Sequence, residues 1–301
     1  MKKELVSVIM PAYNAEKYIG MSIESVMKQT YGEVELIVVD DASTDNTLEV
    51  IRRYASVWHD RIRFAVRQQN GGTAAALNDA IELAEGSYIC WLSADDLYCE
   101  DMVESEVGYL KQNANCDAVF SRCAYIDENN RFLLEGNYPD EFKAMFAMGT
   151  GGIIARLLVG NFWHGCSVLA KAECFKREER FNVAYKGAQD YDFWLRMAAD
   201  YDIGYLDKVN VLSREHSEQG SKKINCCVDE IDVFFHLLYR EDIMMKLYQK
   251  MDAEYAYQNI LPYIEGRIRI YQGKEAEMNA LSQGLRKYID MMENGQLHFQ
   301  C

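Results

Sequence analysis

Adjacent carboxylates occur twice in the N-terminal third of the chain, each time directly after a continuous apolar run. Asp40-Asp41 follows one such run, and Asp95-Asp96 follows another. Neighbouring carboxylates repel each other unless a cation is present, and hard divalent ions bridge such oxygen ligands to substrate phosphates. The second doublet therefore predicts a Mn²⁺ or Mg²⁺ site, and the first predicts a ligand-binding turn. Helix capping at the first doublet and a solvated loop at the second are the simpler alternatives.

A further carboxylate opens a predicted helix near 190–200. Asp190 lies near the N-terminus of this helix, ahead of Phe193 and Trp194, which we expect to face the core. A carboxylate fixed in direction by such an anchor is a candidate general base. An N-cap role explains the same position, and the two roles are compatible.

A polar tract follows the predicted strand at 203–213. It contains Arg214, His216, Ser221 and Lys222. A lone histidine is more often structural than a ligand, but beside an arginine and ahead of a Ser-Lys pair His216 could complete a metal or diphosphate site.

The elements that must position these residues alternate along the chain. Short apolar runs predict strands at 5–10, 34–39 and 87–92, and an alternating pattern predicts one at 62–67. Helices are predicted at 15–28, 46–58 and 73–85. Continuous apolar strands between amphipathic helices are typical of a mostly parallel, Rossmann-like α/β sheet covered on both faces. Ligands of such sheets bind outside the carboxyl ends of the strands, where the polar clusters lie.

Composition and charge exclude several classes of protein. The chain of 301 residues has a formal net charge of −15, which argues against binding to nucleic acid or to anionic lipid. Its 9 cysteines are scattered, without a C-x-x-C pair, so reduced thiols and a cytoplasmic location are expected. No run approaches the length of a membrane span. A peripheral position at the inner membrane face is left open.

Three common nucleotide or nucleophile motifs are missing from the sequence. Neither a P-loop nor a G-x-G-x-x-G after the first strand is present, which argues against P-loop enzymes and dinucleotide dehydrogenases. A G-x-S-x-G nucleophile elbow is absent too.

Read in order, these segments resemble glycosyltransferase family 2, whose fold is called GT-A. The resemblance covers roughly residues 5–222. No single segment is specific to the family, but the order and spacing of the whole set are specific to it. The residues that carry it are Val6–Asn14, Glu35–Thr47, Asn70-Gly71-Gly72, Asn78, Gly86, Trp91–Leu97, Asp190 with Trp194, and Arg214 with His216.

The resemblance implies an inverting transfer of a sugar from a nucleotide-diphosphate sugar to an acceptor hydroxyl, with a divalent metal as cofactor. It implies that Asp41 or Asp40 binds the base, that Asp95 contacts the ribose or metal, and that Asp190 is the general base. Asp96 and His216 would hold the metal. The remaining nucleotide-binding candidates are Pro11, Ala12, Tyr13, Asn14, Gly72 and Asn78. Candidates for the diphosphate or acceptor side are Arg214, Ser221, Trp194 and His164.

The sequence departs from the family pattern in a few places. Ser93 stands where the family often has Asp, Gln189 stands where it often has Glu, and the run Ala74–Leu77 replaces a common Arg. The expected donor is a UDP-sugar, and the expected acceptor is a saccharide or lipid-linked saccharide of cell-surface polysaccharide biosynthesis. A sugar-nucleotide pyrophosphorylase and an inactive nucleotide-sugar-binding subunit that recruits a partner are the alternatives.

The predicted domain organisation is a GT-A catalytic domain at 1–223 and a helical extension at 224–301. Within the first, 1–115 forms the nucleotide-binding half and 116–223 the acceptor half. Apolar stripes in the extension must be buried, either against the catalytic domain or in a homodimer or partner contact.

Overall fold

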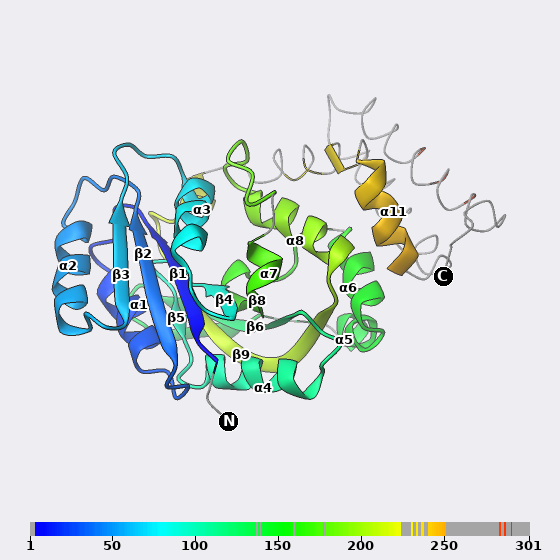
Figure 1. The fold of residues 1–301 in the computed structure, drawn as a ribbon, viewed down its shortest axis with the longest axis horizontal. Coiled ribbons are helices and arrows are strands. Elements are labelled where there is room, and N and C mark those ends of the chain that lie inside the picture. Colours follow the sequence, from blue (N-terminus) through cyan, green and yellow to red (C-terminus); the bar gives the residue numbers. More distant parts are fainter. Residues whose placement is uncertain are drawn as a thin grey trace.

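The computed structural model describes residues 4–136, 138, 140–158, 160–176, 179–223, 230, 233, 236–237, 240–250, 283, 286 and 290. In this part of the chain helices pack around one curved sheet (Figure 1), which confirms the α/β class expected from the sequence. Most of the predicted C-terminal helical extension lies outside the described residues.

The sheet has nine strands in the order β3-β2-β1-β4-β8-β6-β9-β5, with β7 paired to β6. The strands are β1 (Val6–Ala12), β2 (Val34–Asp40), β3 (Ile62–Val66), β4 (Tyr88–Trp91), β5 (Leu97–Tyr98), β6 (Ala118–Asp127), β7 (Phe132–Glu135), β8 (Val168–Lys171) and β9 (Ile203–Glu215).

Helices surround this sheet in chain order. They are α1 (Ile19–Met27), α2 (Thr47–Val57), α3 (Thr73–Leu83), α4 (Met102–Gln112), α5 (Asp140–Ala147), α6 (Thr150–Leu157), the short 3-10 turn η1 (Gly165–Ser167), α7 (Ala172–Phe175), α8 (Gln189–Asp200), α9 (Gly220–Lys223) and α11 (Glu241–Lys250).

The first strands form as the apolar runs predict. All residues of β2 are buried, as expected for a strand that is covered on both faces. Strand β1 continues through Pro11 to Ala12, whereas the sequence predicted its end at Pro11. Pro11 is tolerated because the pairing of β1 with β4 stops at Ile9, so beyond it β1 pairs only with β2.

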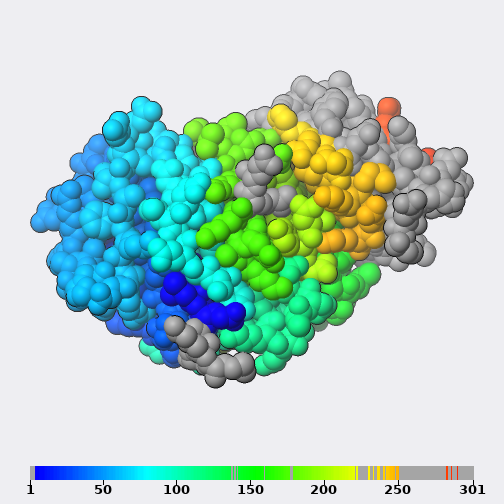
Figure 2. All heavy atoms as spheres, in the orientation of Figure 1, coloured from blue at the N-terminus to red at the C-terminus, as the bar shows by residue number. Residues whose placement is uncertain are grey.

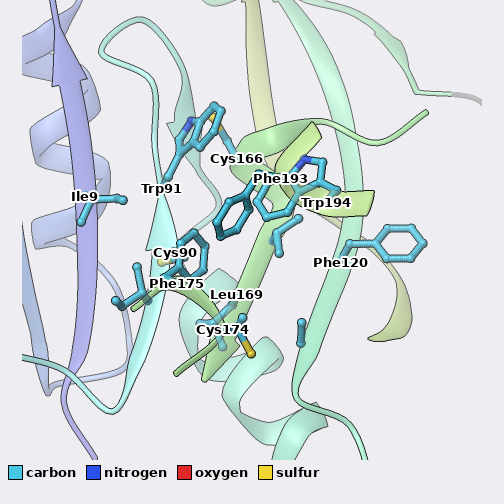
Figure 3. Close-up of a cluster of buried hydrophobic side chains, with 14 of the residues drawn as sticks. Ile9, Cys90, Trp91, Phe120, Cys166, Leu169, Cys174, Phe175, Phe193 and Trp194 are labelled. Atoms are coloured by element: carbon cyan, nitrogen blue, oxygen red, sulfur yellow. The ribbon is translucent and has the colours of Figure 1, made fainter. Parts of the chain in front are cut away.

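Strand β8 joins the two halves of the sheet. Strands β3, β2, β1 and β4 are parallel, whereas β8 runs antiparallel to both β4 and β6. A continuous aromatic core crosses this junction, because Trp91 of β4 packs against Trp194 of α8 with ring centroids 6.3 Å apart (Figure 3). The predicted nucleotide-binding and acceptor halves therefore share one sheet and one core.

Helix α11 packs on the predicted acceptor half, against α8 and α6, and lies beside it in the space-filling view (Figure 2). Its side chains Ile243, Met244 and Leu247 are buried. The ammonium of Lys250 donates to the carbonyl oxygens of Ala198 at 3.2 Å and Tyr201 at 2.9 Å. This segment of the extension thus covers the catalytic domain, as one of the two predicted arrangements requires. None of the described helices combines the length and the apolar character that crossing a bilayer demands.

Candidate active site

The two carboxylates at the end of β2 differ in their contacts. Asp41 is buried, and its oxygens accept the backbone N–H groups of Gly71 at 2.9 Å and Gly72 at 2.8 Å. The guanidinium Nε of Arg67 lies 2.9 Å from Asp41 Oδ1. Asp41 therefore holds the loop before α3 in place, and its oxygens are already engaged.

Asp40 is the carboxylate with a free acceptor. Its Oδ2 accepts the backbone N–H of Ser43 at 3.3 Å, while Oδ1 is buried and has no hydrogen-bond partner within the described part of the chain. An unsatisfied buried oxygen is costly, so a ligand with an N–H group that reached Oδ1 would remove this cost. Of the two residues that the sequence left open, Asp40 is the better placed to accept from a base.

The loops after β1 and β2 are bound to each other. Asn14 adopts a positive φ of 48°, its Oδ1 accepts the backbone N–H of Thr44 at 2.8 Å, and its own N–H donates to Ser43 Oγ at 3.0 Å. Tyr13 is about half exposed beside this junction, at 49%. Pro11 and Ala12 are the last two residues of β1, directly before Tyr13 in the chain.

Gly72 and Asn78 have structural roles at the start of α3 and within it. Gly72 precedes α3 with a φ of 86°, a conformation that favours glycine. The Asn78 amide donates to the carbonyl of Phe181 at 2.8 Å and accepts its N–H at 3.1 Å. Asn78 therefore fixes the segment that leads to α8, and in this arrangement its amide is occupied.

At the end of β4, Asp95 meets His216. The Nε2 of His216 lies 3.0 Å from Asp95 Oδ2, and the Asp95 side chain is 26% exposed. The imidazole also packs against the ring of Tyr18, with centroids 4.8 Å apart. The sequence paired His216 with Asp96 as metal ligands, and the structure places it beside Asp95.

Asp96 is almost fully buried behind Asp95. Its Oδ1 accepts the backbone N–H of Arg214 at 2.8 Å, and its Oδ2 lies 3.6 Å from Cys166 Sγ and 3.5 Å from His164 Nε2. Burial, together with the charge of Asp95, raises the pKa of Asp96 to about 8. The neutral form of this carboxyl therefore persists to a higher pH than it would in water.

The donor atoms of Asp96, His164 and Cys166 lie within 4.8 Å of one another. However, His164 Nδ1 accepts the N–H of Cys166 at 3.3 Å, so the neutral ring carries its proton on Nε2, facing Asp96. Burial also raises the pKa of the Cys166 thiol. Cys166 Sγ therefore donates to Asp96, and the His164 N–H faces the same carboxylate oxygen at 3.5 Å.

Asp95 and His216 also offer donors that suit Mn²⁺ or Mg²⁺, a carboxylate oxygen and an imidazole nitrogen 3.0 Å apart. Asp96 Oδ2 faces His164 and Cys166 instead. A divalent charge beside Asp96 would favour the ionised form of this buried carboxyl.

Asp190 begins α8 and is half-buried. Its Oδ2 accepts from Asn161 Nδ2 at 3.0 Å, and its Oδ1 accepts the backbone N–H of Tyr191 at 2.8 Å. Burial raises the pKa of Asp190, while these two hydrogen bonds oppose the shift. The result is a carboxylate of fixed direction and increased basicity.

One short segment, 161–166, lies between the two groups of carboxylates. Asn161 contacts Asp190, whereas His164 and Cys166 contact Asp96. Gly165 lies under Asp190, since a Cβ added there would be 3.5 Å from Asp190 Oδ2 and 2.9 Å from the Trp91 ring. The candidate base and the candidate cation ligands are therefore held on two sides of the same turn.

Arg214 and Trp194 are both fully buried. Arg214 Nε donates to the carbonyl oxygen of Asp95 at 2.8 Å, so its guanidinium supports the carboxylate loop from behind. Trp194 belongs to the aromatic core, where it packs against Trp91 (Figure 3). Ser221 lies in α9, and its side chain is outside the described part of the structure.

Several residues of this site were not singled out from the sequence. They are Tyr18, Arg67, Asn161 and Cys166. Arg67 is the last residue of the strand predicted at 62–67, so its position near the strand end was a local signal. The others reach the site through long-range packing, for which neither spacing nor residue type gave a sign.

Comparison with protein families gives a match over residues 7–172 to the model described as Glycosyl transferase family 2. An uncharacterized glycosyltransferase of Rickettsia conorii is 36% identical over 245 residues, which make up 80% of this chain and 39% of that protein. The chain thus spans about two fifths of the length of that relative. A putative glycosyltransferase of Bacillus subtilis, EpsE, is 32% identical over 222 residues, 72% of this chain and 76% of that protein.

Solved structures with a similar fold include two that hold a nucleotide sugar. The structure of Staphylococcus aureus TarS 1-349 with UDP-GlcNAc has a TM-score of 0.65 at 19% identity, covering 98% of this chain and 94% of that one. A mannosyltransferase from Pyrobaculum calidifontis with GDP-Man and Mn²⁺ has a TM-score of 0.56 at 20% identity, covering 97% of this chain and 84% of that one. At these identities the likeness is one of fold.

Proposed function

The chain belongs to glycosyltransferase family 2, and from that premise we propose that it transfers a sugar from a UDP-sugar to an acceptor hydroxyl. The observation that carries the proposal is the turn at 161–166, which holds Asp190 on one side and Asp96 on the other. A base for the acceptor and a cation site for the leaving diphosphate must lie this close for a direct displacement.

In the proposed reaction the Asp190 carboxylate accepts the proton of the acceptor hydroxyl. The hydroxyl oxygen then attacks the anomeric carbon, the bond from that carbon to the diphosphate oxygen breaks, and the nucleoside diphosphate leaves. Asn161 and the N–H of Tyr191 keep the carboxylate aimed during this step. Because attack and departure occur on opposite faces, the product has inverted configuration.

Asp95, Asp96 and His216 would hold the divalent metal, Mn²⁺ or Mg²⁺. When bound, the cation neutralises charge on the departing diphosphate. Arg214 supports this loop by donating to the Asp95 carbonyl, and its backbone N–H orients the Asp96 carboxylate. The neighbour that binds GDP-Man together with Mn²⁺ is consistent with cation use.

For the nucleotide, we propose that Asp40 Oδ1 accepts an N–H of the base. Both uracil and guanine present such a group, so Asp40 alone does not select between them. The UDP-GlcNAc complex of the TarS structure favours uridine as the first donor to test. For the acceptor, we propose a saccharide or lipid-linked saccharide in cell-surface polysaccharide synthesis.

The test is release of nucleoside diphosphate from UDP-, GDP- and dTDP-sugars, measured with and without saccharide acceptors. Each reaction is run with Mn²⁺ and with excess EDTA, and the Asp190→Asn variant is the matched control. Acceptor-stimulated release of UDP that requires the cation and is lost in the control supports the proposal. Donor binding without release would indicate an inactive binding subunit. Synthesis of a nucleotide sugar from a sugar phosphate and a nucleoside triphosphate would indicate a pyrophosphorylase.

A further inference from the structure

We propose that Asn130, in the turn between β6 and β7, is a positioning residue for the Asp95-Asp96 loop and acts through Arg214. The proposal rests on the function proposed above, in that this loop takes the cation. Asn130 lies far along the chain from both carboxylates and belongs to none of the motifs that carry the family resemblance.

The turn that carries Asn130 is rigidly built. Asp127 Oδ1 accepts the backbone N–H groups of Asn129 and Arg131, each at 2.8 Å, and the N–H of Asp127 donates to the carbonyl of Arg131 at 2.9 Å. Asn130 itself has a φ of 64°, a left-handed conformation that asparagine tolerates better than most residues. The side chain of Asn130 is thereby presented in a fixed direction.

That side chain meets the buried guanidinium of Arg214. Arg214 Nη1 donates to Asn130 Oδ1 at 2.6 Å and to the Asp127 carbonyl at 3.3 Å. The ring of Tyr18 lies against the guanidinium, 4.8 Å from its central carbon to the ring centroid. One edge of Arg214 is therefore fixed by the turn.

The opposite side of Arg214 reaches the carboxylate loop. Its Nε donates to the Asp95 carbonyl at 2.8 Å, and its backbone N–H donates to Asp96 Oδ1 at 2.8 Å. A guanidinium is planar and rigid, so its Nη1 and Nε cannot be aimed independently. Releasing Nη1 from Asn130 consequently loosens the contact that holds the backbone between Asp95 and Asp96.

The surface contact between the turn and the N-terminal half is the weaker tether. Lys17 and Glu128 form an ion pair of 3.1 Å, but their side chains are 61% and 56% exposed, so water screens it. The hydrogen bond from the buried Arg214 guanidinium to Asn130 is the contact we expect to matter, because hydrogen bonds from a charged donor are shorter and stronger than neutral ones.

The experiment compares Asn130→Gly with Asn129→Gly in the full chain. Glycine adopts a positive φ readily, so Asn130→Gly keeps the turn and removes only the amide. Asn129→Gly makes the same replacement one residue away, where the side chain does not contact Arg214 in the described hydrogen bonds. We measure the Mn²⁺ concentration that gives half-maximal transfer, together with kcat and the donor KM.

We expect Asn130→Gly to raise the half-saturating Mn²⁺ concentration about tenfold, which corresponds to about 1.4 kcal/mol, with a small change in thermal stability. Asn129→Gly should leave it unchanged. Asn130→Asp, which keeps an acceptor for Arg214, should restore a value near that of the wild type. Equal Mn²⁺ requirements in Asn130→Gly and the wild type overturn the proposal.

A second readout does not depend on the cation. Hydrogen–deuterium exchange of the backbone amides in 93–97 should be faster in Asn130→Gly than in Asn129→Gly when no metal is added. Unchanged exchange there overturns the positioning role. Full transfer by the wild-type protein in EDTA would instead overturn the cation assignment of the proposed function, while faster exchange in Asn130→Gly would still support the positioning role.

Discussion

Replacing Glu106 by Gln should make the stability of the protein less dependent on pH. Glu106 lies in α4 and is fully buried, with Oε1 accepting from Ser121 Oγ at 2.6 Å and from Asn210 Nδ2 at 3.0 Å. Its Oε2 is buried without a hydrogen-bond partner among the described residues. Burial raises the pKa of Glu106 from 4.5 to about 8.

The size of the effect follows from this shift. Because the folded protein keeps the proton to a higher pH than the unfolded chain does, the unfolding free energy is greatest at low pH and falls as pH rises towards 8. Between the two pKa values each pH unit removes about 1.4 kcal/mol. From pH 6 to pH 8 the Glu106 contribution should therefore fall by about 2 kcal/mol. The glutamine, which keeps the accepting oxygen and never ionises, should not show this loss.

The assay is urea unfolding of the wild type and Glu106→Gln at several pH values between 5 and 8, without added metal. Other buried acids that titrate in this range, such as Asp96, contribute equally to the unfolding free energy of both proteins, so their contributions cancel in the difference. Between pH 6 and pH 8 a difference of about 2 kcal/mol should accumulate in favour of the variant, or roughly 4–8 °C in Tm. Glu104→Gln, on the exposed face of the same helix, is the control and should show no such trend. If the difference in unfolding free energy between the wild type and the variant does not change with pH, the reasoning is refuted.

Three further outcomes are expected at the site. Asp190→Asn should keep donor binding, measured by calorimetry, but lower transfer by roughly 10²-fold or more; near wild-type transfer would place the base elsewhere. Asp40→Asn should weaken nucleotide binding with little change in Tm, whereas Asp41→Asn, which disturbs three contacts of a buried carboxylate, should cost about 2 kcal/mol of stability as well; equal Tm values for the two variants would contradict this distinction. Asp96→Ala should abolish the Mn²⁺-dependent part of donor binding while far-UV circular dichroism stays unchanged, and undiminished activity of this variant would rule out Asp96 as a ligand.

The sequence predicted the nucleotide-binding half in most of its elements, because its strands are mostly apolar runs or, in β3, an alternating pattern. The family assignment drawn from the order of the motifs is confirmed by the match over 7–172. Helix α4 was not predicted, since its buried face includes Glu106 among apolar residues and so breaks the expected stripe. The antiparallel direction of β8 also carries no local signal, because the apolar pattern of this four-residue strand is the same for a parallel and an antiparallel neighbour.

Within the candidate site, the sequence indicated which residues belong to the site, but not which of their side chains contact one another. Spacing placed Asp95, Asp96 and His216 near one edge of the sheet, but could not show that His216 lies beside Asp95 rather than Asp96. That choice depends on the path of β9, whose register against β6 shifts near Arg122. Irregularities of this kind arise from tertiary packing, which a single sequence does not display.

The shared sheet limits how this molecule can move during turnover. Enzymes whose substrates bind between separate domains often close by rotating one domain about a hinge. Here the pairing of β8 with both β4 and β6, and the contact of Trp91 with Trp194, would break under such a rotation. We therefore expect the sheets of free and donor-bound crystals to superpose, with entry and release of substrates controlled by the loops at the strand ends.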